Sequence, residues 1–150
     1  MIPIYLIPII FMLLLFIYNS WEYNRLKAIS VKLDKILKDK KLNGIKFYRS
    51  HSSIFSFDKI KLVTKIEKQL DLLLKNYNLS FLSRRYSRWS IQFNSGSLYE
   101  SFNRKLDKIL NHIDGDKITF TRHHHFRLLF NSIKILEEIN KKLDKIHKHQ

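Results

Sequence analysis

Residues 1–18 have the sequence MIPIYLIPIIFMLLLFIY, which contains no charged side chain. Every Lys, Arg, Asp and Glu of the chain follows it. An α-helix rises about 1.5 Å per residue, so a helix of this length reaches roughly 27 Å, close to the thickness of a bilayer's hydrocarbon core. The sequence therefore predicts one transmembrane anchor over residues 1–20. The residues expected to contact the membrane are Ile2, Ile4, Leu6, Ile9, Phe11, Leu13, Leu14, Phe16 and Trp21.

Three other interpretations of this segment stay open. A cleavable secretory signal has a basic start and a small-residue cleavage site, whereas no Lys or Arg precedes this run and Tyr18-Asn19-Ser20-Trp21 follows it. A core helix of a soluble protein usually keeps a polar stripe, which this run lacks. A mitochondrial presequence is amphipathic and rich in Arg and Ser. The composition favours a retained span over all three.

Positive charge follows the apolar run closely. Residues 22–38 hold five basic side chains and two acidic ones. Because Lys and Arg are retained on the cytoplasmic side of a membrane, we expect the rest of the chain on the cytoplasmic or matrix side. Tyr18, Trp21 and Tyr23 lie where an interfacial aromatic belt would hold the end of the span at headgroup depth.

The composition limits the organisation of the remaining chain. Its length suffices for one small domain, and we expect a juxtamembrane amphipathic helix over residues 21–42 followed by a basic, mainly helical soluble domain over residues 43–150. The chain has no Cys, which excludes disulfides and thiolate zinc sites. Its net charge of +15 predicts an anionic neighbour: lipid headgroups, an acidic protein face or nucleic acid.

The predicted fold class is mainly α. Leu26, Ile29, Leu33 and Ile36 recur every three or four residues, so the anchor should continue as one helix to about residue 40. A second helix is predicted over residues 57–77, where apolar residues have the same spacing. Its predicted N-cap is Ser56.

Two further helices are predicted in the second half of the chain. The first begins at Ser97, which forms a capping-box pattern with Glu100, and ends near Gly115. The second extends over residues 121–147, where an apolar stripe repeats at helical spacing.

Three short stretches alternate between apolar and polar residues instead, at 45–48, 88–93 and 118–121. They make a minor sheet conceivable, as in an α+β domain. The tetrapeptide Leu-Asp-Lys-Ile also occurs three times, at 33–36, 106–109 and 143–146. Because the flanking residues do not match, we interpret it as a biased composition reusing one amphipathic turn.

The sequence offers little chemistry, and we expect no enzyme. Its three glycines are isolated, so no Gly-rich phosphate loop is present. The carboxylates are scattered among lysines, which is typical of a solvated surface. His123, His124 and His125 are adjacent, and consecutive helical residues point about 100° apart, so they suit a solvated or phosphate-facing helix start better than a metal site. No cofactor, metal or small-molecule substrate is expected.

Arginines alternate with aromatic residues in one polar stretch of the chain. Guanidinium groups beside aromatic rings can contact phosphates and stack on bases, and the same pattern suits an anionic membrane surface. A strand with its arginines in solvent is the third interpretation. The candidate contacts for an anion, a lipid or nucleic acid are Arg84, Arg85, Tyr86, Arg88, Trp89, Arg122, His123 and Arg127.

These features favour a noncatalytic, single-pass accessory or structural subunit of a large membrane complex, of the respiratory-chain or ATP synthase type. Residues of A/T-rich codons, such as Phe, Ile, Asn and Lys, are abundant, so we favour an organelle-encoded protein of the mitochondrial inner membrane over one of a bacterial plasma membrane. Its expected partners are other subunits and anionic lipid. A membrane-tethered RNA- or DNA-binding protein, such as an organellar ribosome component, is the first alternative. A membrane-perturbing toxin or phage holin is the second.

Overall fold

The computed structural model describes residues 1–42, 56–81, 95–114 and 129–150. Within these ranges the fold is all-α, with four helices and no strand. The predicted mainly α class is thus confirmed for this part of the chain, whereas the three alternating stretches proposed as a minor sheet lie outside it. The helices are α1 (Leu6–Asp39), α2 (Ser56–Asn76), α4 (Ser95–Asp114) and α5 (Leu129–Lys148).

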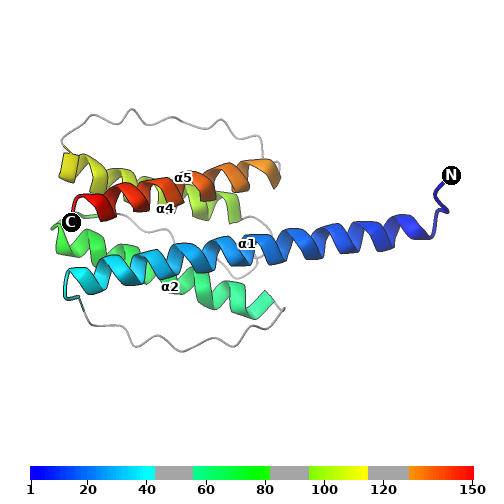
Figure 1. Ribbon diagram of the computed structural model, residues 1–150, viewed down its shortest axis with the longest axis horizontal. Coiled ribbons are helices and arrows are strands. Elements are labelled where there is room, and N and C mark those ends of the chain that lie inside the picture. The colour runs from blue at the N-terminus through cyan, green and yellow to red at the C-terminus, as the bar shows by residue number, and fades with distance from the viewer. Residues whose placement is uncertain (43–55, 82–94, 115–128) are drawn as a thin grey trace.

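Helix α1 extends without a break from the apolar run into the charged part of the chain, as the sequence predicts. Its 34 residues correspond to about 50 Å of helix. Pro8 lies in the first turn of α1, where backbone N–H groups have no partner within the helix. Its missing N–H therefore breaks no internal hydrogen bond. The second half of α1 packs in a four-helix bundle, and the first half projects from one end of it (Figure 1).

All four helices run in the same direction (Figure 1). Side-chain contacts agree with this arrangement, because the first turns of α2, α4 and α5 contact the middle of α1 and the last turns of the helices contact one another. Near the projecting anchor, the Lys59 ammonium pairs with the Glu22 carboxylate. At the opposite end, His147 lies 3.6 Å from the carboxylate of Asp39. The bundle is therefore parallel, with the anchor at the end where every other helix begins.

Each helix contacts two neighbours, in the cyclic order α1, α2, α4, α5 and back to α1. A parallel bundle needs long connections, because the chain must return to the starting end after each helix. A helix of 20 residues is about 30 Å long, which about nine or ten extended residues can span. The segments between the helices, residues 40–55, 77–94 and 115–128, are all longer than this.

The four helices present equivalent residues at a nearly constant interval. Leu33, Leu70, Leu106 and Leu143 are fully buried and follow one another at separations of 37, 36 and 37 residues. Each is followed by an Asp that forms an ion pair with a Lys of the next helix in the cycle. We call these pairs the Asp–Lys ring. They are Asp34–Lys65, Asp71–Lys105, Asp107–Lys142 and Asp144–Lys32.

The ring corrects our interpretation of the repeated Leu-Asp-Lys-Ile as a product of composition alone. Its three copies supply three of the four buried leucines and three of the four ring aspartates. The fourth copy, Leu70-Asp71-Leu72-Leu73, escapes the sequence comparison because Leu72 and Leu73 replace the Lys and Ile of the other three. The residue before it, Gln69, occupies the position of a Lys in the other helices. Its amide nitrogen donates to Asp34 at 2.6 Å, so this side chain still contacts the ring aspartate of the preceding helix.

The core extends along the bundle from Leu26 to the last turns. It consists almost entirely of Leu and Ile, with Tyr99 and Phe102 as its largest side chains. Burying each such side chain contributes about 1.5–3 kcal/mol, so the apolar stripes, more than helix propensity, hold the bundle together.

Two helix starts differ from their predicted positions. Helix α4 begins at Ser95, so Ser97 lies inside its first turn and is not the N-cap. Ser95 donates a hydrogen bond to Glu22 of α1, a tertiary contact that local capping patterns do not contain. Similarly, Ser56 is the first residue of α2 rather than the residue before it.

Candidate membrane anchor and polar junction

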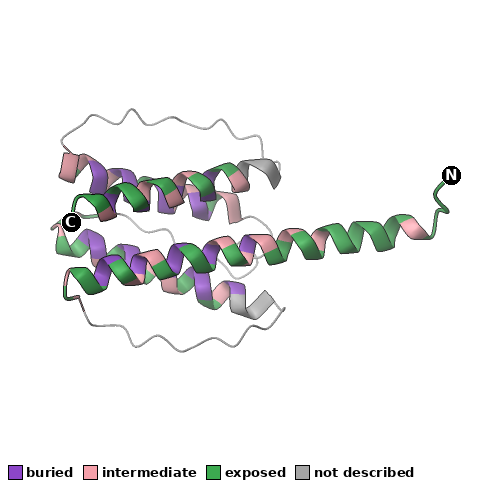
Figure 2. Ribbon diagram, viewed as in Figure 1, coloured by how far each residue is buried: buried purple, intermediate pink, exposed green. Residues whose placement is uncertain are grey.

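The apolar half of α1 has no protein around it. Phe11 and Ile17 keep 60% and 61% of their surfaces exposed, and only 6% of an 18-residue window of mean hydropathy 1.5 is buried. Figure 2 shows this half of the helix almost entirely exposed. The helix is long and apolar enough to cross a membrane, which a signal sequence also is. The alternative of a core helix of a soluble protein is wrong, because the run lies outside the core.

Most of the predicted membrane contacts lie on this exposed half. Leu6 is half-buried, and the rest are exposed apart from Trp21. The exposed residues are Ile2, Ile4, Ile9, Phe11, Leu13, Leu14 and Phe16.

Trp21, the last of the predicted membrane contacts, lies at the start of the bundle. Its indole is half-buried against the core, and the Arg25 guanidinium lies 5.1 Å from the ring centroid. Tyr23 also packs on the core. These rings follow the end of the apolar run, where the sequence predicts an aromatic belt, and they also pack on the core of the bundle. The local spacing of residues in the sequence does not show that three other helices begin beside Trp21 and Tyr23.

Glu22 forms a buried polar centre where the anchor enters the bundle. It is the first charged residue of the chain and only 1% exposed. Lys59 of α2 donates to Oε2 at 2.9 Å, and Ser95 of α4 donates to Oε1 at 3.1 Å. The Tyr99 hydroxyl, also from α4, donates a short hydrogen bond to Oε1. We call these four residues the junction.

The junction connects helices that are not neighbours. Helices α1 and α4 lie diagonally across the bundle, and Glu22 reaches Ser95 and Tyr99 through its interior. Tyr18, one turn before Glu22, makes a side-chain hydrogen bond with Ser132 of α5. All four helices are therefore connected by polar side chains within one turn of the end of the apolar run.

Burial and charge explain the electrostatics of the junction. The ammonium of Lys59, itself 9% exposed, compensates the buried carboxylate, since an isolated buried charge is very costly. Burial raises the pKa of Tyr99 well above its usual value, and the Glu22 charge and hydrogen bond raise it further. Tyr99 therefore remains a hydrogen-bond donor far into the alkaline range. Three donors occupy the oxygens of the Glu22 carboxylate, so this group connects α1 to α2 and α4.

The junction follows the same repeat as the Asp–Lys ring. Counted from the buried leucine of each helix, one position is occupied by Glu22, Lys59, Ser95 and Ser132. Four equivalent positions thus hold an acid, a base and two hydroxyls. Sequence reasoning missed this group, because Glu22 counts there only as one negative charge among five positive ones. Aligning the chain on its leucines would have placed Lys59 opposite it.

A second buried charge lies between α2 and α4. Lys105 is fully buried and donates to Asp71 at 2.6 Å, with Glu67 at 3.9 Å. Burial raises the pKa of Glu67, the charge of Lys105 lowers it and the charge of Asp71 raises it again. Because both of its acidic partners lie on α2, Lys105 fixes the register of these two helices rather than forming an accessible reactive amine.

Several predicted contacts fall outside the described residues. They are Arg84, Arg85, Tyr86, Arg88, Trp89, Arg122, His123 and Arg127, together with His124 and His125. Among the residues that the structure describes, no group of three His, Asp or Glu side chains is arranged to hold a metal ion. His112 packs edge-on against the ring of Tyr77, with the centroids 5.5 Å apart.

The two C-terminal histidines contact other helices. His147 belongs to α5 and lies near Asp39 of α1. His149 follows the helix, and its Nε2 lies 2.8 Å from a carboxylate oxygen of Asp114 in α4. These two contacts connect the end of the chain to two other helices.

Comparison with protein-family models, with characterised proteins and with solved structures finds no match to this chain.

Proposed function

We propose that the chain is a noncatalytic, single-pass membrane protein whose bundle docks onto other subunits of a membrane complex. The observation that supports this most is the division of α1, whose first half is apolar and exposed while its second half forms part of the core. Burying one large apolar side chain stabilises by about 1.5–3 kcal/mol, so this exposed row favours insertion into a bilayer by tens of kcal/mol.

The same helix supports a structural role. An uninterrupted helix bends little, and the junction and Tyr18 connect it to the other three helices at the level where the apolar run ends. The bundle would therefore stand on the membrane surface with its axis along the span. Such an arrangement holds a docking surface at a fixed height and direction, as an accessory subunit requires.

The cellular setting is a proposal from the sequence. The positive charge after the span favours the cytoplasmic or matrix side, and the A/T-rich codon composition favours the mitochondrial inner membrane and a respiratory-chain or ATP synthase assembly. The cationic surface of the described helices would contact an acidic subunit or anionic lipid headgroups.

Two measurements test this proposal. The native protein should resist alkaline carbonate extraction and float with vesicles, and purification in mild detergent should recover it in a heavy complex. Recovery as a free monomer would contradict the docking role. Complete release by carbonate would contradict the anchor.

The N-terminal sequence of the mature protein distinguishes a retained span from a cleaved signal. We expect the mature protein to retain the apolar run, because Tyr18 and Glu22 connect this helix to the bundle. A mature chain that begins near Ser20 would show that the segment is removed.

A further inference from the structure

The end of the bundle opposite the anchor, which we call the distal face, consists of the last turns of four parallel helices. Described side chains link these ends into one surface. Lys40 lies 4.4 Å above the ring of Tyr77, and His112 packs against that ring from α4. Asp114 of α4 in turn pairs with Lys145 and His149.

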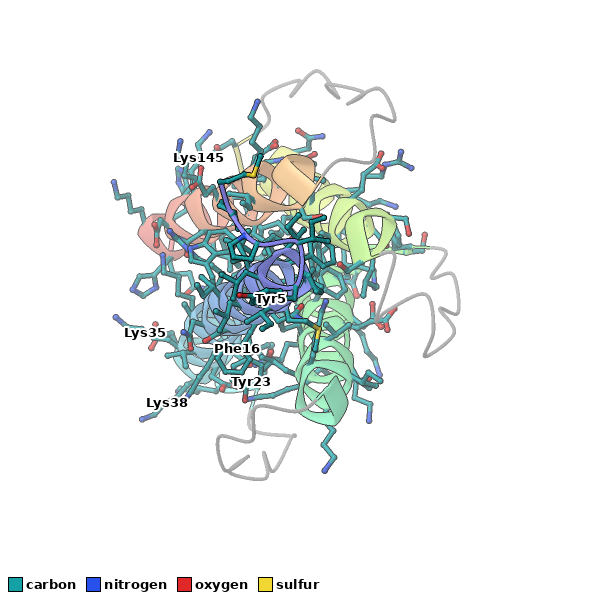
Figure 3. The ribbon with its side chains drawn as sticks, turned by 90° about the vertical axis from the view of Figure 1, so that its right-hand side faces the viewer. Tyr5, Phe16, Tyr23, Lys35, Lys38 and Lys145 are labelled. Carbon is teal, nitrogen blue, oxygen red and sulfur yellow. The ribbon has the colours of Figure 1, made fainter. Side chains whose placement is uncertain are left out.

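Positive charge is concentrated on this face. Its described side chains include the exposed lysines Lys38, Lys75 and Lys148, which occupy equivalent positions in three of the four helices. Lys40 and Lys41 follow the end of α1. Figure 3, seen along the bundle, shows Lys38 pointing outward at its periphery.

The two described aspartates of the distal face do not balance this charge. Asp114 contacts Lys145 and His149, and Asp39 is exposed and lies 3.6 Å from His147, so two carboxylates face six described lysines: Lys38, Lys40, Lys41, Lys75, Lys145 and Lys148. The lysines thus remain available to an external anion.

Helix dipoles explain only part of this distribution. One basic side chain in the last turn complements the partial negative charge of a helix end, and each of the four helices has at least one. Helix α5 alone carries Lys145, His147 and Lys148. In addition, Lys41 adopts a φ of 56°, in the left-handed region where glycine is the least costly residue. A lysine thus occupies a position that backbone geometry alone would give to glycine.

An open pocket of about 480 Å³ lies between the ends of α1 and α5. It is lined by Asp39, Lys40, His147, His149 and Gln150. An ammonium group and two imidazoles at its wall can donate hydrogen bonds to a carboxylate side chain.

We propose that the distal face is the docking surface for an acidic protein segment, rich in Asp or Glu, of a partner subunit. This inference depends on the proposed docking function and names the place and chemistry of the contact. The described residues favour protein over nucleic acid, because their basic groups here are Lys and His rather than Arg. Lys40 lies over the described ring of Tyr77 and His112 packs edge-on against it, which leaves less of this ring for stacking on a base.

Fluorescence anisotropy with the full chain in neutral-lipid nanodiscs tests the proposal. The probe is a labelled peptide of 20 glutamates, compared with a labelled 20-nucleotide oligodeoxythymidine at the same salt. The triple variant Lys41→Gln, Lys75→Gln, Lys148→Gln removes three distal charges. Its matched control is Lys27→Gln, Lys61→Gln, Lys134→Gln, which removes three exposed charges near the anchor.

We expect the distal variant to weaken peptide binding about tenfold, because three exposed ion pairs together contribute on this order, and the control to weaken it less than about threefold. Circular dichroism melting of both variants verifies that the bundle is intact. Equal weakening by both variants, or no peptide binding at all, would overturn the proposal. Tighter binding of the oligonucleotide, sensitive to the distal variant, would overturn it in favour of nucleic acid.

The two proposals fail separately. A heavy complex that survives the distal substitutions leaves the docking function in place and removes the distal face as its site. Distal peptide binding by a protein that is a free monomer in mild detergent removes the docking function instead.

Discussion

Glu22 shows how one side chain can determine the arrangement of helices around it. A buried carboxylate needs a cation and hydrogen-bond donors, and here the cation comes from α2 while both hydroxyl donors come from α4. A slip of α2 or α4 by one turn would move a partner by about 5.4 Å and leave the charge unpaired. The junction therefore specifies parallel orientation and register together, which an apolar core of Leu and Ile does weakly.

The first prediction concerns this pair of charges. We expect Glu22→Ala to lower the free energy of unfolding by about 3–5 kcal/mol, because it leaves the Lys59 ammonium buried without a partner. Urea denaturation of the detergent-solubilised protein measures this. The double variant Glu22→Gln, Lys59→Met should recover part of the loss. The control Glu100→Ala removes an exposed pair with Arg104 and should change the stability by less than about 0.5 kcal/mol.

The second prediction concerns alkaline pH. Burial beside Glu22 raises the pKa of Tyr99, so the unfolded chain loses the phenol proton at a lower pH than the folded chain. The contribution of this residue to the free energy of unfolding is therefore complete only below the unfolded pKa of about 10. Above that pH this residue should lower the stability by up to about 1.4 kcal/mol per pH unit. Tyr99→Phe should be less stable by about 1–3 kcal/mol at pH 7 and should lose stability less steeply between pH 10 and 11. An unchanged alkaline slope in Tyr99→Phe would contradict this assignment.

At the scale of the element, α1 combines two kinds of helix in one. Its first half is apolar on every side, whereas its second half has a buried stripe that begins at Leu26 and an exposed face that includes Lys27, Lys35 and Lys38. The hydrogen-bonded backbone continues through Asn19, so the direction of the anchor fixes the direction of the bundle.

The third prediction tests this continuity. Asn19→Pro places proline in the helix interior, where it removes a backbone hydrogen bond and costs about 3 kcal/mol or more. We expect the bundle still to fold, because its core begins at Leu26, but the anchor to move relative to it. The distance distribution between spin labels at Met12 and Lys75, measured by pulsed electron resonance, should broaden. Asn19→Ala, with the same labels, should retain the narrow distribution.

At the scale of the molecule, the bundle is a closed cycle of four similar helices. Three neighbouring pairs are consecutive in the chain, and the fourth, α5 and α1, is joined only by side-chain contacts such as Lys32 with Asp144 at 2.5 Å. The Lys32–Asp144 ion pair is of the same kind as the three Asp–Lys pairs between consecutive helices. Side chains therefore close the cycle between α5 and α1, where no chain segment connects the two helices. The parallel arrangement also brings four helix C-termini together at the distal face, where basic side chains offset their partial charges.

The fourth prediction tests the parallel arrangement, for which a chain without Cys is convenient. Spin labels at residues 27 and 134 lie near the anchor, whereas residue 148 lies about 20 Å farther along the bundle. We therefore expect the distance from 27 to 148 to exceed that from 27 to 134 by about 10 Å. Labels at 38 and 148, both near the distal face, are the control and should be close. An antiparallel α5 would reverse the order of the first two distances.

Periodicity predicted the described helices well because it depends on local spacing. The predicted range 57–77 is within one residue of α2 at each end, and the predicted end of α1 near residue 40 also agrees with the structure. The contacts between helices could not be predicted in this way. Glu22 and Tyr99 are separated by 77 residues, and no local rule relates two positions so far apart.

The sequence by itself determined that the chain has one apolar segment without charge, long enough to span a bilayer, and several amphipathic helices after it. Both follow from the spacing and hydrophobicity of neighbouring residues. Only the tertiary structure decided that these helices run parallel, that the repeated Leu-Asp-Lys-Ile forms part of a ring, and that Glu22 connects the anchor to the bundle. The physical reason is that a buried charge or an ion pair acquires its role from partners that only folding brings within hydrogen-bond distance.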